Sequence, residues 1–121
     1  IIDLGTNNFE RVDYPLLAES LCKKITEKEV DYGIALCGTG IGMSIACNKV
    51  NGIICGKIST IKEAKLCKEH NNCNVIAMSG KINKIKAKIM VTRFLKSKPI
   101  EEEPYITRNR QLKEIEERNS K

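Results

Sequence analysis

The sequence predicts an α/β fold with a parallel sheet, and two observations carry the prediction. Short apolar runs of the kind that form buried strands alternate along the chain with stretches of amphipathic, helix-like spacing. A strand, a helix and a further strand in succession form a parallel sheet with helices packed on its faces. Ligands bind such sheets beyond the carboxyl ends of the strands, so residues directly after a strand are the first site candidates.

The first half of the chain supplies two expected strands and two expected helices. Residues 1–5 are interpreted as the end of a strand, and a helix is expected to begin at Asp13, with Pro15 tolerated in its first turn. Its apolar face is expected to hold Leu16, Leu17, Ser20, Leu21 and Ile25. Residues 32–37 predict a buried strand, and residues 41–50 predict a helix that follows a glycine-rich turn.

The middle of the chain repeats this pattern. Residues 51–52, Asn-Gly, predict a turn, and residues 53–58 predict the next strand. Ser59 or Thr60 is expected to cap a helix that runs to about Glu69. If Thr60 is the N-cap, Glu63 is spaced for a capping box.

The last third predicts one further strand and two further helices. Residues 74–78 predict a strand, and residues 82–95 predict a helix with Ile85, Ile89 and either Phe94 or Leu95 facing inward. An acidic linker is expected over residues 98–104, followed by a highly charged helix over residues 107–117.

The composition excludes several classes of protein. The chain has 121 residues, which is the size of a single domain, and its net charge is +6. Its lysines are scattered with few aromatic residues among them, so no nucleic-acid partner is expected, whereas phosphorylated metabolites fit the charge. The sequence has no run of about twenty apolar residues, so no membrane span is expected.

Cysteine usage favours reduced thiols in the cytoplasm. The six cysteines are Cys22, Cys37, Cys47, Cys55, Cys67 and Cys73. None forms a closely spaced pair and no secretory signal is visible, so a disulfide framework is not expected. Because the chain has one histidine and no paired ligand spacing, no metal site is expected.

One segment carries most of the chemical information. Cys37 ends an apolar run and is followed by Gly38, Gly40 and Gly42, at the expected start of a helix. The glycines allow positive φ and close approach of a ligand, and the helix start directs free N–H groups toward it. A thiol at this position has a lowered pKa and raised reactivity. The segment therefore predicts an anion cradle beside a reactive cysteine.

The glycine-rich segment and three other segments resemble those of a known family. Residues 37–50, CGTGIGMSIACNKV, look like the signature of type B ribose-5-phosphate isomerases, a sugar-phosphate isomerase family that also holds the galactose-6-phosphate isomerase subunits. Three further segments resemble family segments in the same order: residues 2–6 (IDLGT), 12–15 (VDYP) and 69–75 (EHNNCNV). The resemblance covers about residues 1–97.

The resemblance implies a three-layer α/β/α sandwich around a five-stranded parallel sheet. It also implies a homodimer or homotetramer with active sites shared between subunits, a small sugar phosphate as partner, and no cofactor. The family's first strand, with its aspartate and histidine, is absent from this sequence, which is expected of a fragment or of a short form. Residues 1–98 are therefore expected to form a core without that strand, and residues 99–121 a linker and a charged helix.

The resemblance assigns the chemistry of proton transfer to the glycine-rich segment. The implied reaction interconverts an aldose phosphate and a ketose phosphate, foremost ribose 5-phosphate and ribulose 5-phosphate, through an enediolate. Cys37 is the implied base, Thr39 positions the substrate or the base, and backbone N–H groups of residues 38–42 hold the oxyanion. Substrate contacts are expected at Gly38, Gly40, Gly42 and Ser44.

Other roles fall on residues further along the chain. His70 is the implied acid/base that opens the furanose ring, and Asn71 is expected to bind substrate hydroxyls. Lys81 stands where the family carries arginine, and binds phosphate as a point charge. Arg108 and Arg110 are candidates for the family's C-terminal phosphate-binding arginines, or else belong to a solvated helix.

Two alternatives stay open. Ser79-Gly80-Lys81 and the charged tail resemble a galactose-6-phosphate isomerase subunit, whereas Glu69-His70-Asn71 favours a ribose-5-phosphate isomerase. A non-catalytic subunit that binds sugar phosphates is the alternative from another class, because the family's first motif is missing.

Overall fold

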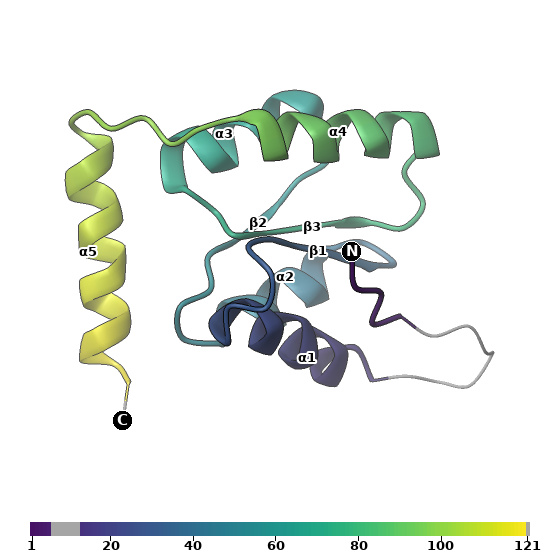
Figure 1. Cartoon of the computed structure of the whole chain (residues 1–121), viewed down its shortest axis with the longest axis horizontal. Helices are drawn as coiled ribbons and strands as arrows, with labels where there is room; N and C mark the ends of the chain where they lie inside the picture. Colours follow the sequence, from purple (N-terminus) through teal and green to yellow (C-terminus); the bar gives the residue numbers. More distant parts are fainter. Residues whose placement is uncertain (6–12, 121) are drawn as a thin grey trace.

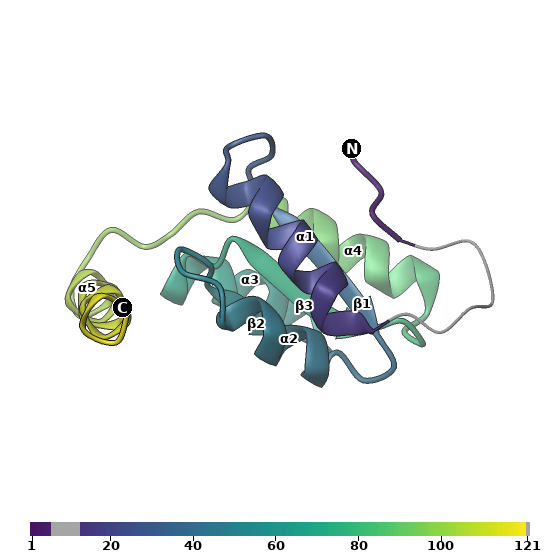
Figure 2. The ribbon, with the colours of Figure 1, turned by 90° about the horizontal axis from the view of Figure 1, so that it is seen from below.

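The computed structural model describes residues 1–5 and 13–120 and forms a three-layer α/β/α sandwich. Its elements are α1 (Tyr14–Thr26), β1 (Gly33–Cys37), α2 (Ile41–Asn48), β2 (Cys55–Lys57), α3 (Ile61–Asn71), β3 (Val75–Ser79), α4 (Lys84–Lys96) and α5 (Tyr105–Arg118). Helices α1 and α2 cover one face of the sheet and α3 and α4 cover the other, while α5 stands beside the sandwich (Figure 1, Figure 2).

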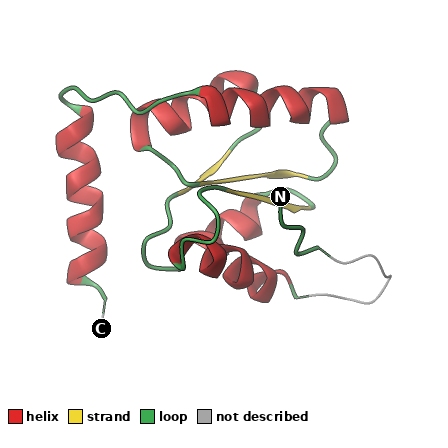
Figure 3. Ribbon diagram, viewed as in Figure 1, coloured by secondary structure: helices red, strands yellow, loops and turns green. Residues whose placement is uncertain are grey.

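The sheet is parallel, with strand order β1-β3-β2 in the part of the chain that the structure describes (Figure 3). Strand β3 is central and pairs in register with β1, from Gly33 opposite Val75 to Cys37 opposite Ser79. The carboxyl ends of β1 and β3 therefore lie side by side. This pairing positions the segment after Cys37 next to the segment after Ser79.

Two apolar cores lie on the two faces of the sheet. Because successive strand residues face opposite sides, Val75 and Ala77 of β3 pack toward α1 and α2, whereas Ile76 and Met78 pack toward α3 and α4. The first core also contains Ala18, Cys22, Met43 and Cys47, and the second contains Ile58, Ala64, Met90 and Phe94. The predicted α/β fold with helices on both faces is confirmed.

The predicted inward faces of two helices were wrong in part. In α1, Leu16 is 65% exposed, and the fully buried residues are Ala18 and Cys22, whose small side chains allow close packing against α2 and the sheet. In α4, Ile85 is 71% exposed and Ile89 is also exposed, as is Leu95, while Met90 and Phe94 are buried. Leu17, Leu21 and Ile25 of α1 pack against the first core as predicted, so in α1 the prediction was wrong only for Leu16 and Ser20, which are exposed.

Residues 1–5 form no strand, contrary to the prediction. The side chain of Asp3 accepts a hydrogen bond from the N–H of Gly5 at 2.8 Å, and this local turn replaces the pairing that a strand needs. Strand β2 is also shorter than expected. The N–H of Ile53 bonds the Val50 carbonyl and the N–H of Ile54 bonds the Asn74 side chain, so both are taken before the ladder begins.

Candidate active site

The loop between β1 and α2 folds around the thiol of Cys37. Gly40 lies at the N-cap of α2 with a φ of 85°, and its N–H donates a hydrogen bond of 3.2 Å to Cys37 Sγ. A Cβ at Gly40 would lie 2.8 Å from the carbonyl carbon of Met78 in the neighbouring strand. Positive φ and the lack of space both require glycine here, and the chain can therefore wrap its N–H groups around the sulfur.

The surroundings of Cys37 favour its thiolate. Partial burial acts to raise the pKa of Cys37, but hydrogen bonds from the backbone N–H groups of Met43, Gly40, Thr39 and Gly42 outweigh it and lower the pKa below its ordinary value. Four N–H groups at a helix start form an anion nest. The N–H groups of this nest are directed at the Cys37 sulfur and lower the pKa of its thiol.

The end of β3 holds this loop in place. The Ser79 hydroxyl donates to the Gly38 carbonyl at 2.7 Å and accepts from the N–H of Lys81 at 3.1 Å, while the N–H of Gly80 donates to the Cys37 carbonyl at 2.8 Å. The segment after β3 therefore brings Lys81 to the same edge of the sheet. Sequence analysis gave Ser79 no role, although its place at the end of a neighbouring strand is the signal that could have indicated one.

Two side chains near the cradle have partners other than a substrate. The Thr39 hydroxyl accepts a hydrogen bond of 3.1 Å from the N–H of Ile41 and so caps the first turn of α2. A hydrogen bond from the Ser44 side chain acts to lower the pKa of Cys55 in β2, against the larger raising effects of Cys47 and of burial. Ser44 therefore lies close to β2.

Tyr14 forms a wall of the cradle that the sequence analysis did not identify. A Cβ at Gly42 would lie 2.8 Å from Cε1 and Cζ of Tyr14 and 3.0 Å from its hydroxyl oxygen. The phenol therefore covers the backbone of Gly42, with 44% of Tyr14 exposed. We call residues 37–44 and 79–81 together with Tyr14 the thiol half-site.

A second group of polar and aromatic side chains lies at the end of α3. The rings of His70 and Tyr105 are stacked, with centroids 4.7 Å apart and planes inclined by 20°. Asn109 Nδ2 donates to the His70 carbonyl at 2.9 Å, and Asn71 Nδ2 donates to Asn109 Oδ1 at 3.2 Å. We call these four residues the histidine half-site.

The expected phosphate-binding arginines lie close to this second group. Arg108 and Arg110 are on α5, which also carries Tyr105 and Asn109, and both are exposed. The Nε atom of Arg110 lies 3.4 Å from a carboxylate oxygen of Glu114 one turn away.

The two half-sites lie at opposite edges of the sheet. Cys37 pairs with Ser79 at the carboxyl end of β3, whereas α3 ends at Asn71, before β3 begins at Val75. Figure 1 shows α5 on the side where α3 ends. Because β3 alone spans about 13 Å at 3.3 Å per residue, Cys37 and His70 of one chain do not meet around one small substrate.

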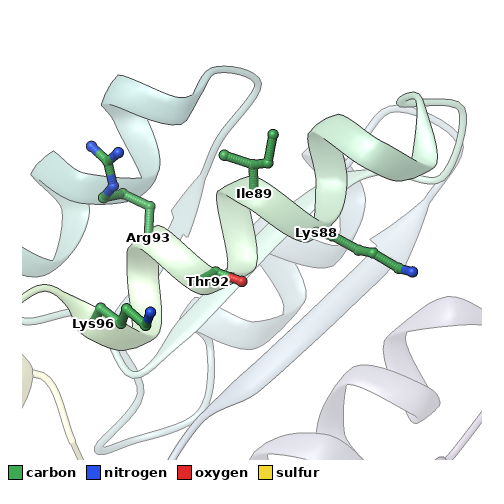
Figure 4. A pocket seen from close by; sticks show the side chains of 5 residues that line it. All are labelled: Lys88, Ile89, Thr92, Arg93 and Lys96. Atoms are coloured by element: carbon green, nitrogen blue, oxygen red, sulfur yellow. The ribbon is translucent and has the colours of Figure 1, made fainter.

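A separate hollow lies on the outer face of α4, away from both half-sites. Its volume is about 330 Å³ and it is lined by Lys88, Ile89, Thr92, Arg93 and Lys96 (Figure 4). Among residues 1–5 and 13–120, no group of three His, Cys, Asp or Glu side chains is placed to hold a metal ion. None of the helices formed by those residues is long and apolar enough to cross a membrane.

Comparison with known proteins identifies the family of the chain. Residues 1–115 match the family described as Ribose/Galactose Isomerase. The chain belongs to this family. It is 41% identical over 85 residues to galactose-6-phosphate isomerase subunit LacB of Clostridium acetobutylicum, an alignment that covers 70% of this chain and 49% of the relative. It is 41% identical over 96 residues to ribose-5-phosphate isomerase B of Escherichia coli, covering 78% and 64%.

Solved structures agree with this family. Type B ribose 5-phosphate isomerase of Leishmania infantum superposes with a TM-score of 0.91 at 33% identity, covering 96% of this chain and 76% of that one. Ribose-5-phosphate isomerase B of Clostridium thermocellum gives a TM-score of 0.91 at 35% identity, covering 98% and 80%. Matched to the curated relatives, the chain spans about half to two thirds of their length, 49% of the first and 64% of the second.

Proposed function

We propose that this isomerase-family protein interconverts an aldose phosphate and a ketose phosphate, with ribose 5-phosphate and ribulose 5-phosphate as its substrate pair. The observation that carries the proposal is the Cys37 sulfur in its nest of four backbone N–H groups. The reaction needs a base poised near neutral pH and fixed donors for a developing oxyanion. The thiol half-site supplies both within one loop.

The proposed proton transfer uses Cys37 in both directions. Its thiolate removes the proton from C2 of the open-chain aldose, and the electron pair of that C–H bond forms the C1–C2 double bond as the C1 carbonyl becomes an oxyanion. As the sulfur takes up the proton and loses its charge, backbone N–H groups of residues 38–42 stabilise the oxyanion instead. The Cys37 thiol then returns the proton to C1, and the proton of the C2 hydroxyl passes to the O1 oxyanion, so that C2 becomes the ketone and C1 carries a hydroxyl. The thiolate is regenerated and no cofactor is consumed.

Ring opening is assigned to the histidine half-site. Imidazole can donate and accept protons near neutral pH, so His70 suits the transfer from the ring hydroxyl to the ring oxygen. Asn71 lies next to it and offers an amide to substrate hydroxyls. Because the two half-sites of one chain lie at opposite edges of the sheet, we propose that His70 and Asn71 serve the Cys37 of a second copy, in a homodimer or homotetramer with shared sites.

The phosphate group needs cations that both half-sites provide. Lys81 lies at the edge of the thiol half-site as a point charge, and Arg108 lies one helical turn from Tyr105 on α5. Arg110 is held in part by Glu114. We propose Lys81 and Arg108 as the principal phosphate ligands, Arg110 as an outer one, and a place in cytoplasmic pentose phosphate metabolism.

A galactose-6-phosphate isomerase subunit is the second candidate. The similarity to subunit LacB of Clostridium acetobutylicum favours it, at 41% identity over 85 residues. The two candidates share the enediolate chemistry and differ in sugar length and in whether a partner subunit is required.

A paired assay tests the proposal. The protein is offered ribose 5-phosphate and galactose 6-phosphate, with Cys37→Ser as the variant and inorganic phosphate binding as the control for an intact site. We expect turnover of ribose 5-phosphate that falls by about 10²-fold or more in the variant, with phosphate binding retained. Turnover that survives in Cys37→Ser would exclude Cys37 as the base. Phosphate binding without turnover of either sugar would favour the non-catalytic alternative.

A further inference from the structure

Helix α5 is attached to the sandwich at few points, and these points converge on the end of α3. None of the residues of α5 is buried. Within residues 1–5 and 13–120, its specific contacts with the body are the Tyr105–His70 stack, the Asn109 bonds to His70 and Asn71, and a carboxylate of Glu116 that accepts from the N–H of Gly52 at 3.1 Å. Two of the three attachments therefore fall on the two residues assigned to ring opening.

The end of α3 needs partners from outside the helix. The last carbonyls of a helix have no partner within it and must find one elsewhere. Here Asn109 Nδ2 donates to the carbonyl of His70, and the N–H of Ile100 donates to the carbonyl of Glu69 at 2.9 Å. The linker and α5 thus complete the hydrogen bonding of the helix end that carries His70. Asn72, which follows with a φ of 47°, turns the chain toward β3.

Stacking restricts the imidazole as well as the backbone. A ring 4.7 Å away and inclined by only 20° fixes the plane of the His70 ring and covers one of its faces. His70 is only partly buried, so the residue keeps some access to solvent. Proton transfer depends steeply on geometry, and a misplacement of about 1 Å can cost on the order of 10²-fold in rate.

We propose that Tyr105 and Asn109, one turn apart on α5, are positioning residues that hold the imidazole of His70 and the amide of Asn71 in the orientation for ring opening. Tyr105 acts through the ring plane, and Asn109 acts through the backbone carbonyl of His70 and the side chain of Asn71. The catalytic part of this inference rests on the proposed isomerase function, whereas the structural part does not.

The sole histidine makes the structural part directly measurable. The chain contains one histidine, so its ring protons give a single set of NMR signals. Stacking beneath a tyrosine shifts these signals upfield. We expect Tyr105→Leu to move them downfield, toward the position of an unstacked histidine, and Tyr105→Phe to keep them near the wild-type position because the ring is retained.

Two further variants separate positioning from simple attachment of the helix. Glu116→Ala removes the other anchor of α5 without touching His70, and Ile106→Ala changes an exposed neighbour on the same helix. We expect both to leave the His70 signals in place. If Glu116→Ala shifts them as far as Tyr105→Leu does, His70 senses attachment of the whole helix, and the specific role of Tyr105 is refuted.

Steady-state kinetics complete the test. We expect Tyr105→Leu and Asn109→Leu to lower kcat by about tenfold to 10²-fold with little change in KM, and Tyr105→Phe to restore most of kcat. Equal kcat values in Tyr105→Leu and the wild type would overturn the proposal. If the wild type turns over neither sugar phosphate, the proposed function fails, and the NMR comparison alone then decides whether Tyr105 orients His70.

Discussion

At the scale of single residues, surroundings separate Cys37 from two of the buried thiols, Cys22 and Cys73. The pKa of Cys22 is raised by a hydrogen bond with Cys47 and by burial, and that of Cys73 is raised by a hydrogen bond with Cys67 and by burial. Cys22 is 0% exposed and Cys73 is 3% exposed. Cys37 is partly exposed, and backbone N–H groups lower its pKa despite its partial burial. Cys37 therefore combines partial access with a lowered pKa, which are the two properties that a proton-transfer residue needs.

This difference predicts that Cys37 is alkylated faster than the buried Cys22 and Cys73. The thiolate is the reacting form, so a lowered pKa means faster labelling by iodoacetamide at pH 7 and a rate that levels off at a lower pH than for an ordinary thiol. Peptide mass spectrometry across a pH series gives the rate for each cysteine. As the control, the urea-denatured chain should label with a midpoint near pH 8.5. A Cys37 profile that coincides with the denatured one would contradict an activated thiolate.

Gly40 and Gly38 provide a matched pair for the loop itself. A methyl group at Gly40 would lie 2.8 Å from the backbone of Met78, and the φ of 85° at this position is unfavourable for any residue with a side chain. Gly40→Ala should therefore lower the free energy of unfolding by about 1–3 kcal/mol. At Gly38 nothing lies within 4 Å of the added Cβ, so Gly38→Ala should stay within about 0.5 kcal/mol of the wild type. Urea titration measures both, and equal losses would contradict this account of the loop.

At the scale of elements, α3 shows local sequence and structure in agreement. The Thr60 hydroxyl accepts from the N–H of Glu63 at 3.0 Å, and the Glu63 carboxylate accepts from the N–H of Thr60 at 3.1 Å. This is the capping box that the spacing predicts. The same carboxylate accepts from the N–H of Ser59 at 2.7 Å, which together with the other bonds lowers the pKa of Glu63.

The cap predicts a measurable loss on substitution. Thr60→Ala removes the acceptor for the N–H of Glu63 and should lower the free energy of unfolding by about 1 kcal/mol. Thr60→Ser keeps a hydroxyl and should retain most of that stability. Denaturation followed by circular dichroism compares the two variants. If Ala and Ser are equally stable, the hydroxyl does not stabilise α3.

The elements also show which structural features can be predicted from residues close in sequence. The capping box, the Asn51-Gly52 turn and the strand–glycine–helix segment depend on residues close in sequence, and the structure contains all three. The inward faces of α1 and α4 depend on which apolar stripe meets a neighbour, and there the prediction failed in part. No pattern in the neighbouring sequence predicts the burial of Lys68, which is 2% exposed. Its ammonium lies 3.7 Å from the ring centroid of Tyr32 and 4.4 Å from that of Phe94.

In the candidate site too, the residues that are close in sequence could be predicted, whereas those brought together by tertiary packing could not. Cys37 and its glycines lie in one short segment, so the sequence predicts the cradle directly. Ser79 and Tyr14 come from other elements and join the thiol half-site only through the parallel pairing of β1 with β3 and the packing of α1 on α2. Tyr105 reaches His70 through a contact between the last helix and α3, which no spacing in the sequence records.

At the scale of the whole molecule, the arrangement of the two half-sites constrains how a site can form. One chain presents a thiol at the carboxyl edge of the sheet and an imidazole at the amino edge, with β3 between them. A symmetric pair of copies can place the thiol edge of each against the histidine edge of the other, because the same patch then meets its complement twice. Two composite sites would result, each built from both copies.

Shared sites predict that two inactive variants rescue each other. Cys37→Ser lacks the proposed base and His70→Ala lacks the proposed ring-opening group, so each alone should have little activity. In a mixed dimer, one site combines the intact Cys37 of one copy with the intact His70 of the other, while the second site carries both substitutions. Random exchange of subunits yields mixed dimers as half of the population, so the mixture should recover about a quarter of wild-type turnover.

The measurement is the activity of the two purified variants after unfolding and refolding together, compared with each variant refolded alone. A double variant mixed with the wild type is the control, because its mixed dimers hold no site with both residues intact. An inactive mixture, from variants that each still bind phosphate, would show that Cys37 and His70 do not act across a subunit boundary.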